Sequence, residues 1–98
     1  MALEIVWTKR AEIGYDNIMK YLQIHFTENE VRNFVSQSND FLNLLSVFPE
    51  LLKKTTKRNN VHRGPINENT ILTYRINPRK KQIELINIRQ ARQKPIGQ

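Results

Sequence analysis

The sequence contains no cysteine among its 98 residues, and it has only three glycines and four prolines. Without cysteine, the protein can form no structural disulfide and can carry out no thiolate chemistry. The small numbers of glycine and proline exclude a collagen-like or linker-dominated chain. Apolar runs are short as well, and none approaches the roughly 18 residues that a membrane span requires, so we expect no transmembrane segment.

The first seven residues contain Glu4 and only a short apolar stretch, which is not the pattern of a signal peptide. We therefore expect the protein to stay in the cytoplasm. Hydrophobic residues make up 39% of the sequence and charged residues 26%, a balance that is typical of a small globular protein and not of a disordered one. This length is the usual size of one cooperative core, so residues 1–98 are predicted to form a single domain.

The positive charge is concentrated in the second half of the sequence. Residues 1–49 hold four basic and six acidic side chains, a balance of −2, whereas residues 50–98 hold twelve basic and three acidic ones, a balance of +9. Such asymmetry favours a polyanionic or acidic partner for the C-terminal half. A basic surface that serves only solubility would have the same composition.

The first half predicts one strand and two helices. Residues 3–7 alternate apolar and other side chains as a short strand does, and Thr8 is a suitable N-cap for a helix that runs to about Ile24. Thr27 and Glu30 have the spacing of a capping box, so a second helix begins there and ends before Pro49. The apolar stripe of this second helix comprises Val31, Phe34, Val35, Ser38, Phe41, Leu42, Leu45 and Phe48.

The second half predicts a basic loop followed by three strands. Residues 53–60 are too charged for a core element, and residues 61–66 form a weak strand that Gly64 and Pro65 restrict to a sheet edge. Residues 70–76 and 82–88 form an antiparallel hairpin around a turn at 77–80. The predicted fold class is α+β, with an N-terminal strand and a two-helix hairpin packed on an antiparallel sheet that three C-terminal strands complete.

Motifs for metal, nucleotide or hydrolase chemistry are absent from the sequence. It has no glycine-rich phosphate loop, no CxxC and no HExxH, and His25 and His62 lie in different elements without acidic residues at ligand spacing. Ser36, Ser38 and Ser46 all fall within the second helix, so no Ser/His/Asp constellation can be argued. We expect neither a metal nor a cofactor.

Cations of the second half form the candidate site. Binding of a target or of an acidic partner is predicted for Lys53, Lys54, Arg58, Arg63, Arg75, Arg89 and Arg92. Such side chains bind phosphates, stabilise the charge that develops when an RNA 2′-hydroxyl attacks its phosphodiester, or bind an acidic protein segment. RNA cleavage would also need a general base and a general acid, for which the candidates are His62, Glu68, Tyr74 and Glu84, and no catalytic residue is assigned.

Several segments are similar to one family of small proteins. Arg92-Gln93-Lys94-Pro95 directly follows the last apolar strand, where ParE-like proteins typically show an Arg, two variable residues and a Pro. The opening Val6-Trp7-Thr8 before a helix and the strand at 70–76 are similar too. On these residues and on the order of its elements, nearly the whole chain resembles the RelE/ParE superfamily of toxins from type II toxin–antitoxin (plasmid stabilisation) systems.

Departures from the family pattern indicate which branch of the superfamily the chain resembles. RelE-like members that cut messenger RNA on the ribosome carry an Arg early in the third strand, where this chain has Ile71, and an aromatic residue or His beyond the last strand, where residues 95–98 offer none. The nuclease set is therefore incomplete. The resemblance favours the ParE-like branch, whose members are similar to toxins that block DNA gyrase, although Gln90 stands where that branch often has a His.

The resemblance also implies the partners. A cognate antitoxin would cover the basic and apolar surfaces with an acidic, amphipathic segment that folds on binding. DNA gyrase is the expected target, and the ribosome with its messenger RNA is the alternative, in which case the protein would be an endoribonuclease. A third reading, an inert relative that binds only an antitoxin, predicts no growth defect.

Overall fold

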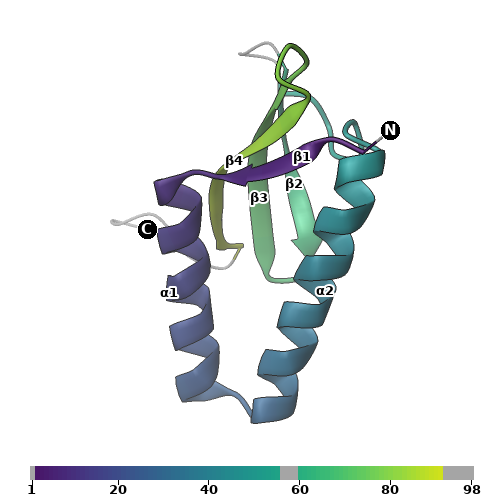
Figure 1. The fold of residues 1–98 in the computed structure, drawn as a ribbon. Coiled ribbons are helices and arrows are strands. Elements are labelled where there is room, and N and C mark those ends of the chain that lie inside the picture. Colours follow the sequence, from purple (N-terminus) through teal and green to yellow (C-terminus); the bar gives the residue numbers. More distant parts are fainter. Residues whose placement is uncertain (1, 56–59, 92–98) are drawn as a thin grey trace.

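The elements follow the predicted order in the computed structural model, which describes residues 2–55 and 60–91 (Figure 1). The strands and helices are β1 (Glu4–Trp7), α1 (Lys9–His25), α2 (Glu28–Val47), β2 (Val61–Asn67), β3 (Thr70–Asn77) and β4 (Gln82–Gln90). The predicted strands and helices are thus confirmed, with ends shifted by one or two residues.

Both helices begin at the predicted caps because side chains there bind otherwise unpaired backbone groups. Ala11 N–H donates to Thr8 Oγ1 at 3.2 Å at the start of α1. At the start of α2, Glu30 N–H donates to Thr27 Oγ1 at 3.3 Å, and Thr27 N–H donates to the Glu30 carboxylate at 3.4 Å, which is a complete capping box. The helix ends at Val47, two residues before Pro49.

The four strands form one sheet in the order β1-β4-β3-β2, with β2 at an edge as its Gly64 and Pro65 predicted. The β2–β3 and β3–β4 pairs are antiparallel, but β1 pairs with β4 in parallel. The prediction of a wholly antiparallel sheet is therefore wrong at β1. The helical hairpin explains the difference, because α2 brings the chain back beside the start of β1, where Leu3 N–H donates to Ser46 O at 2.8 Å. As a result, β2 and β4 run in the same direction as β1.

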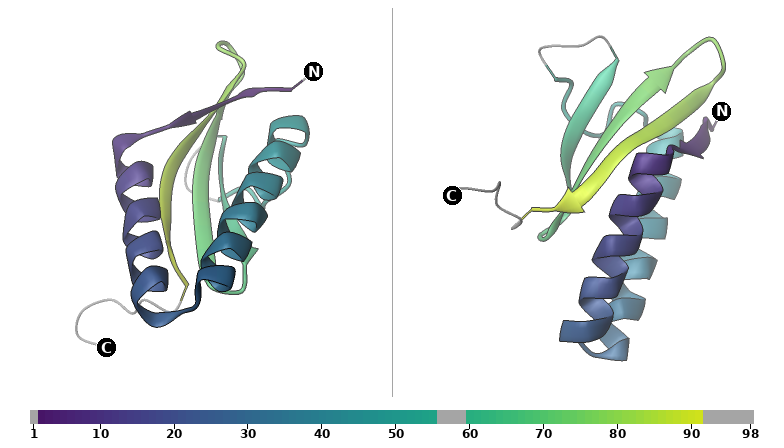
Figure 2. Two further views of the ribbon diagram at one scale, coloured as in Figure 1. Left: turned by 60° about the horizontal axis from the view of Figure 1, so that its bottom comes forward. Right: turned by 90° about the vertical axis from the view of Figure 1, so that its left-hand side faces the viewer.

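The two helices cover one face of the sheet, and the core lies between these layers (Figure 2). Its buried members are Ala11, Ile18, Phe34, Leu45, Leu72, Tyr74, Ile83, Leu85 and Ile88. Phe48, which the periodicity placed on the apolar stripe of α2, is 57% exposed. The helix has ended by this residue, and the non-helical backbone of Phe48 (φ −120°, ψ 77°) takes its side chain out of the stripe.

Helix α1 approaches the backbone of β4 at Gly14. A Cβ atom at this position would overlap the carbonyl oxygen of Ile88, which is backbone and cannot move aside as a flexible side chain would. The absence of a side chain therefore sets the distance between α1 and the sheet.

Tyr74 in β3 holds the segment that follows α2 against the sheet. Its hydroxyl donates to Pro49 O at 2.6 Å and accepts a hydrogen bond from Leu52 N–H at 3.3 Å. The ring of His62 stacks on that of Tyr74 with centroids 5.1 Å apart, and His62 Nδ1–H donates to Leu52 O at 2.8 Å. We call these residues the Tyr74 clamp, because they fix the chain between Pro49 and Leu52 just before the basic segment.

Burial raises the pKa of Tyr74 above its ordinary value of 10.0; the hydrogen bond from Leu52 opposes this shift, and the nearby Glu50 carboxylate adds to it. The phenol therefore keeps its proton at neutral pH and remains the donor to Pro49 O. Ionisation above pH 10 is easier in the unfolded chain than in the folded one, so the clamp contributes full stability below that pH and loses it above.

Replacing Gly14 by alanine tests the close approach of α1. In a helix, alanine is more favourable than glycine by about 1 kcal/mol of folding free energy. Forcing its extra methyl group against the backbone of β4 costs about 1 to 3 kcal/mol, which outweighs that gain. We expect Gly14→Ala to lower the free energy of unfolding measured by urea denaturation, and Asn17→Ala, at an exposed position of α1, to leave it unchanged or raise it. A Gly14→Ala protein more stable than wild type would contradict the proposed contact with Ile88.

Replacing Tyr74 by phenylalanine tests the clamp. The change removes the hydroxyl alone and leaves Pro49 O and Leu52 N–H without this partner, for which we expect a loss of about 1 to 3 kcal/mol in unfolding free energy. Tyr21→Phe is the matched control, because that ring is 43% exposed. Equal melting temperatures for the two variants would show that the clamp does not stabilise the fold.

Candidate functional site

Three of the predicted site residues lie on the face of the sheet that the helices leave open. Side chains alternate along a strand, so burial of Leu72 and Tyr74 on the helix side directs Arg75 to the other face. Arg63 in β2 pairs with Thr73, which makes Arg75 its diagonal neighbour, about 7 to 8 Å away between Cα atoms. Arg89 in β4 is on the same face, opposite Ile71.

These arginines differ in their surroundings. Arg75 Nε donates to Glu84 Oε1 at 3.1 Å across the β3–β4 pair, with half of its side chain exposed. Arg89 is half-buried and donates from Nη1 to Gln90 O at 3.3 Å. Arg63 is exposed, and no described acidic side chain forms an ion pair with it. It is therefore the arginine of this face whose charge is most available to a ligand.

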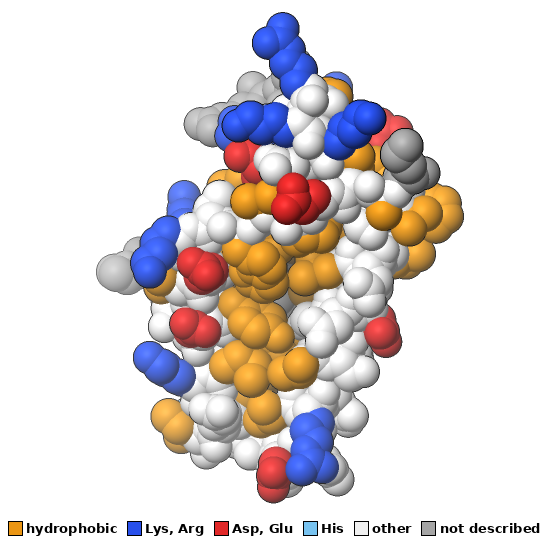
Figure 3. All heavy atoms as spheres, viewed as in Figure 1, with side chains coloured by type: hydrophobic (Ala, Val, Ile, Leu, Met, Phe, Trp, Pro, Cys, Tyr) orange, Lys and Arg blue, Asp and Glu red, His pale blue; other side chains and the backbone are white. Residues whose placement is uncertain are grey.

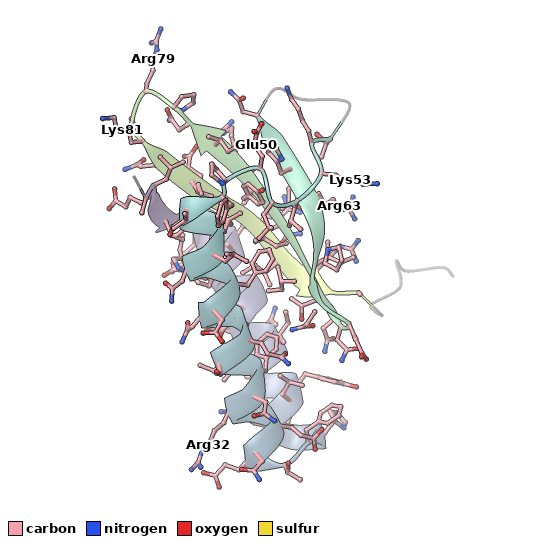
Figure 4. The ribbon with its side chains drawn as sticks, turned by 90° about the vertical axis from the view of Figure 1, so that its right-hand side faces the viewer. Arg32, Glu50, Lys53, Arg63, Arg79 and Lys81 are labelled. Carbon is pink, nitrogen blue, oxygen red and sulfur yellow. The ribbon has the colours of Figure 1, made fainter. Side chains whose placement is uncertain are left out.

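Residues 53–55, directly after the Tyr74 clamp, extend the sheet beyond β2. Arg63 N–H donates to Lys53 O at 2.9 Å and Thr55 N–H donates to Val61 O at 2.8 Å, with Lys54 directly opposite His62. Alternation then places Lys53 on the open face beside Arg63, as Figure 4 shows, and Lys54 on the side of the helices, where His62 packs.

The structure thus brings together four of the seven predicted cations, which we call the open-face cations: Lys53, Arg63, Arg75 and Arg89. Lys54 belongs to the other side of the sheet edge. Arg58 and Arg92 lie outside the described residues. The open-face cations suit an extended anion, such as a phosphate backbone or an acidic peptide.

The candidate acids and bases do not meet on this face. His62 and Tyr74 are buried on the helix side of the sheet, Glu84 is paired with Arg75, and Glu68 lies in the turn between β2 and β3. Within residues 2–55 and 60–91, no three His, Cys, Asp or Glu side chains cluster as a metal site would need. No helix in this part of the chain is long and apolar enough to span a membrane.

A groove of about 270 Å³ lies between the far end of the helical hairpin and the β2–β3 turn. We call it the hairpin-end groove. Its apolar wall consists of Ile18, Leu22, Phe26 and Phe34, and its polar rim includes Glu30, Asn33, Gln37, Asn67, Glu68, Asn69 and Gln90. Figure 3 shows the band of hydrophobic side chains between the two helices. Sequence reasoning missed this groove, because separate segments form it and no spacing in the sequence relates them.

Thr70 lines the same groove. Its side chain is almost fully buried, and its Oγ1 atom has no hydrogen-bond partner among the described residues. A buried hydroxyl without a hydrogen-bond partner lowers the stability of the fold.

Comparison with known proteins adds evidence on the fold. No protein-family model matches the sequence, and no curated protein is similar to it in sequence. In structure, a chain of the chromosomal ParDE TA system from P. aeruginosa matches with a TM-score of 0.71 at 14% identity, over 91% of this chain and 96% of that one. A chain of the toxin–antitoxin complex RelBE2 from Mycobacterium tuberculosis matches with a TM-score of 0.63 at 13% identity, over 92% and 99%. The protein therefore has the RelE/ParE-like α+β fold that its sequence resembles.

Proposed function

We propose that this protein is the toxin of a type II toxin–antitoxin system, that it belongs to the ParE-like branch and inhibits DNA gyrase, and that a cognate antitoxin neutralises it. The observation that carries the proposal is the fold, which is shared over nearly the whole chain with members of two toxin–antitoxin assemblies. The cations that the sequence singled out support it further, because four of them occupy one accessible face.

The arrangement of that face favours binding over cleavage. Cutting RNA requires a base to activate the 2′-hydroxyl and an acid to protonate the leaving oxygen, both close to the phosphate. The carboxylate of Glu84 is engaged with Arg75, and the imidazole of His62 is on the far side of the sheet. Ribosome-dependent cleavage of messenger RNA is the second candidate, because Lys53 and Arg63 could still stabilise charge on a phosphate.

Two surfaces suit the antitoxin. An acidic segment would be attracted to the open-face cations, and an amphipathic segment would place apolar side chains against Phe26 and Phe34 in the hairpin-end groove. Glu30 and Glu68 lie on the rim of the groove, and none of the described residues that line it is Lys or Arg. The segment in the groove should therefore be apolar with neutral or basic flanks, and the acidic segment should bind elsewhere.

Arg63 tests the open face. Expression of the wild-type protein without antitoxin should arrest bacterial growth, and Arg63→Gln should weaken the arrest by about tenfold or more in surviving colonies, since a charged anchor is worth several kcal/mol to binding. Arg32→Gln is the control: Arg32 is an exposed arginine on α2 that pairs with Glu28 at 3.2 Å. Full growth arrest by a folded Arg63→Gln protein would remove this residue from the site.

The order of cellular events separates the targets. Inhibition of gyrase should induce an SOS reporter before protein synthesis falls, and purified toxin should block supercoiling by purified gyrase. A fall in translation with cut messenger RNA before any SOS response would favour the nuclease and contradict the gyrase proposal. Normal growth of cells that contain the folded wild-type protein would contradict both.

Phe26 tests the groove as an antitoxin site. Its side chain is 42% exposed, so Phe26→Ala should change stability little and leave growth arrest intact. Coexpression with the cognate antitoxin should rescue wild-type cells but rescue cells with Phe26→Ala at least about tenfold less well, a loss of at least about 1.4 kcal/mol in binding. Ile24→Ala, at an exposed position that does not line the groove, is the control. Equal rescue of the two variants would place the antitoxin elsewhere.

A further inference from the structure

The tip of the β3–β4 hairpin carries three consecutive cations that the candidate site does not include. Arg79, Lys80 and Lys81 are all exposed and lie between the ends of the two strands. The hairpin projects beyond the helical layer at one end of the molecule (Figure 2), and Arg79 is at its apex (Figure 4). The tip is thus a narrow, strongly basic projection.

The backbone of the tip is well defined. Lys80 N–H donates to Asn77 Oδ1 at 3.2 Å, and Lys81 N–H donates to Pro78 O at 3.3 Å. Lys81 O accepts a hydrogen bond from Glu4 N–H at 3.0 Å, which ties the tip to β1. Lys81 has a φ of 54°, in the left-handed region that glycine and asparagine adopt most readily. A charged side chain is therefore present where the backbone itself favours a smaller residue.

Two acidic residues near the base of the tip, Glu4 and Glu84, are bonded to other side chains. Glu84 pairs with Arg75, and Glu4 accepts a hydrogen bond from Gln82 Nε2 at 2.9 Å. The ion pairs of the described part of the chain involve none of the three tip cations. Three positive charges within one turn consequently face solvent together.

The surroundings of the tip favour nucleic acid over protein as its partner. Protein interfaces bury an apolar centre, whereas binding to phosphates needs only cations and the release of counterions. The large exposed apolar side chains of the described residues all lie on the helices or just after them, and none lies in the hairpin turn: Ile13, Tyr21, Ile24, Phe26, Leu44, Val47, Phe48 and Leu51. A protein would find no apolar centre to bury at the tip.

The shape of the tip favours duplex DNA in particular. A major groove about 12 Å wide in B-form DNA admits a two-stranded β-ribbon, whereas the major groove of A-form RNA is deep and narrow. The geometry points to a DNA-binding element: the tip of the β3–β4 hairpin enters the major groove of duplex DNA, and Arg79, Lys80 and Lys81 contact the phosphates on either side. This element is separate from the open-face cations, and the inference does not depend on which target the toxin has.

Fluorescence anisotropy with a labelled 20-base-pair DNA duplex tests the inference. The variant Arg79→Gln/Lys80→Gln/Lys81→Gln should bind at least about tenfold more weakly than wild type in 50 mM salt. The slope of log K against log salt should become shallower by up to about 2.7, since each phosphate contact contributes about 0.9. Lys9→Gln/Arg10→Gln/Lys20→Gln removes the same charge from exposed positions of α1 and should weaken binding less than about threefold.

A second variant and other ligands distinguish the possible outcomes. If the triple variant has a lowered melting temperature, the double variant Arg79→Gln/Lys80→Gln replaces it, because Lys81 with its left-handed backbone is then unchanged. The double variant should also bind DNA more weakly, with a smaller change in the slope of log K against log salt. Equal losses in the two triple variants would reduce the effect to net charge and overturn the inference. It would also be overturned by unchanged DNA binding, by tighter tip-dependent binding of duplex RNA, or by tip-dependent binding of polyglutamate without binding of DNA.

Discussion

The hydrogen bonds of Tyr74 connect the core of this protein to its candidate site. One hydroxyl in the middle of the sheet binds the backbone on both sides of Glu50, and the stacked His62 ring binds the same segment from the edge strand. The side chain of Leu52 also packs against the core from this segment. With these bonds the segment runs alongside β2, and Lys53 takes its position next to Arg63. The position of Lys53 on the open face thus depends on a buried, protonated phenol.

The alternation of side chains in the sheet separates the apolar from the charged residues. Each strand contributes one set of residues to the helical layer and the other set to the open face, so a core and a cationic surface lie back to back across one layer of backbone. The ion pair between Arg75 and Glu84 lowers the net charge at the centre of that surface, whereas Arg63 and Lys53 remain free of described acidic partners at its edge. A ligand would meet the strongest positive charge at the edge of the sheet, beside β2.

The sequence predicted those features that depend on residues close to one another in the chain. The Thr27–Glu30 capping box, the Thr8 cap and the stop before Pro49 are local, and so is the placement of β2 at an edge by Gly64 and Pro65. The fold class followed from these elements and from the family resemblance.

Features that depend on pairing between distant segments could not be predicted in the same way. The parallel direction of β1 follows from the return path through α2, and the separation of Lys54 from Lys53 follows from pairing with β2. The hairpin-end groove arises only when the helix ends meet the β2–β3 turn.

The edges of the sheet restrict how other chains can attach to it. At the β2 edge, Lys53 and Thr55 already occupy backbone hydrogen-bonding groups of Arg63 and Val61, and Pro65 has no N–H to offer. At the other edge, β1 covers Gln82–Leu85 of β4, and α1 approaches the β4 backbone farther along, where Gly14 meets Ile88 O. A free strand from another molecule therefore finds little backbone to pair with, which protects the protein from edge-to-edge aggregation. Assembly must instead proceed through side chains on the faces of the layers, where shape and charge select the partner.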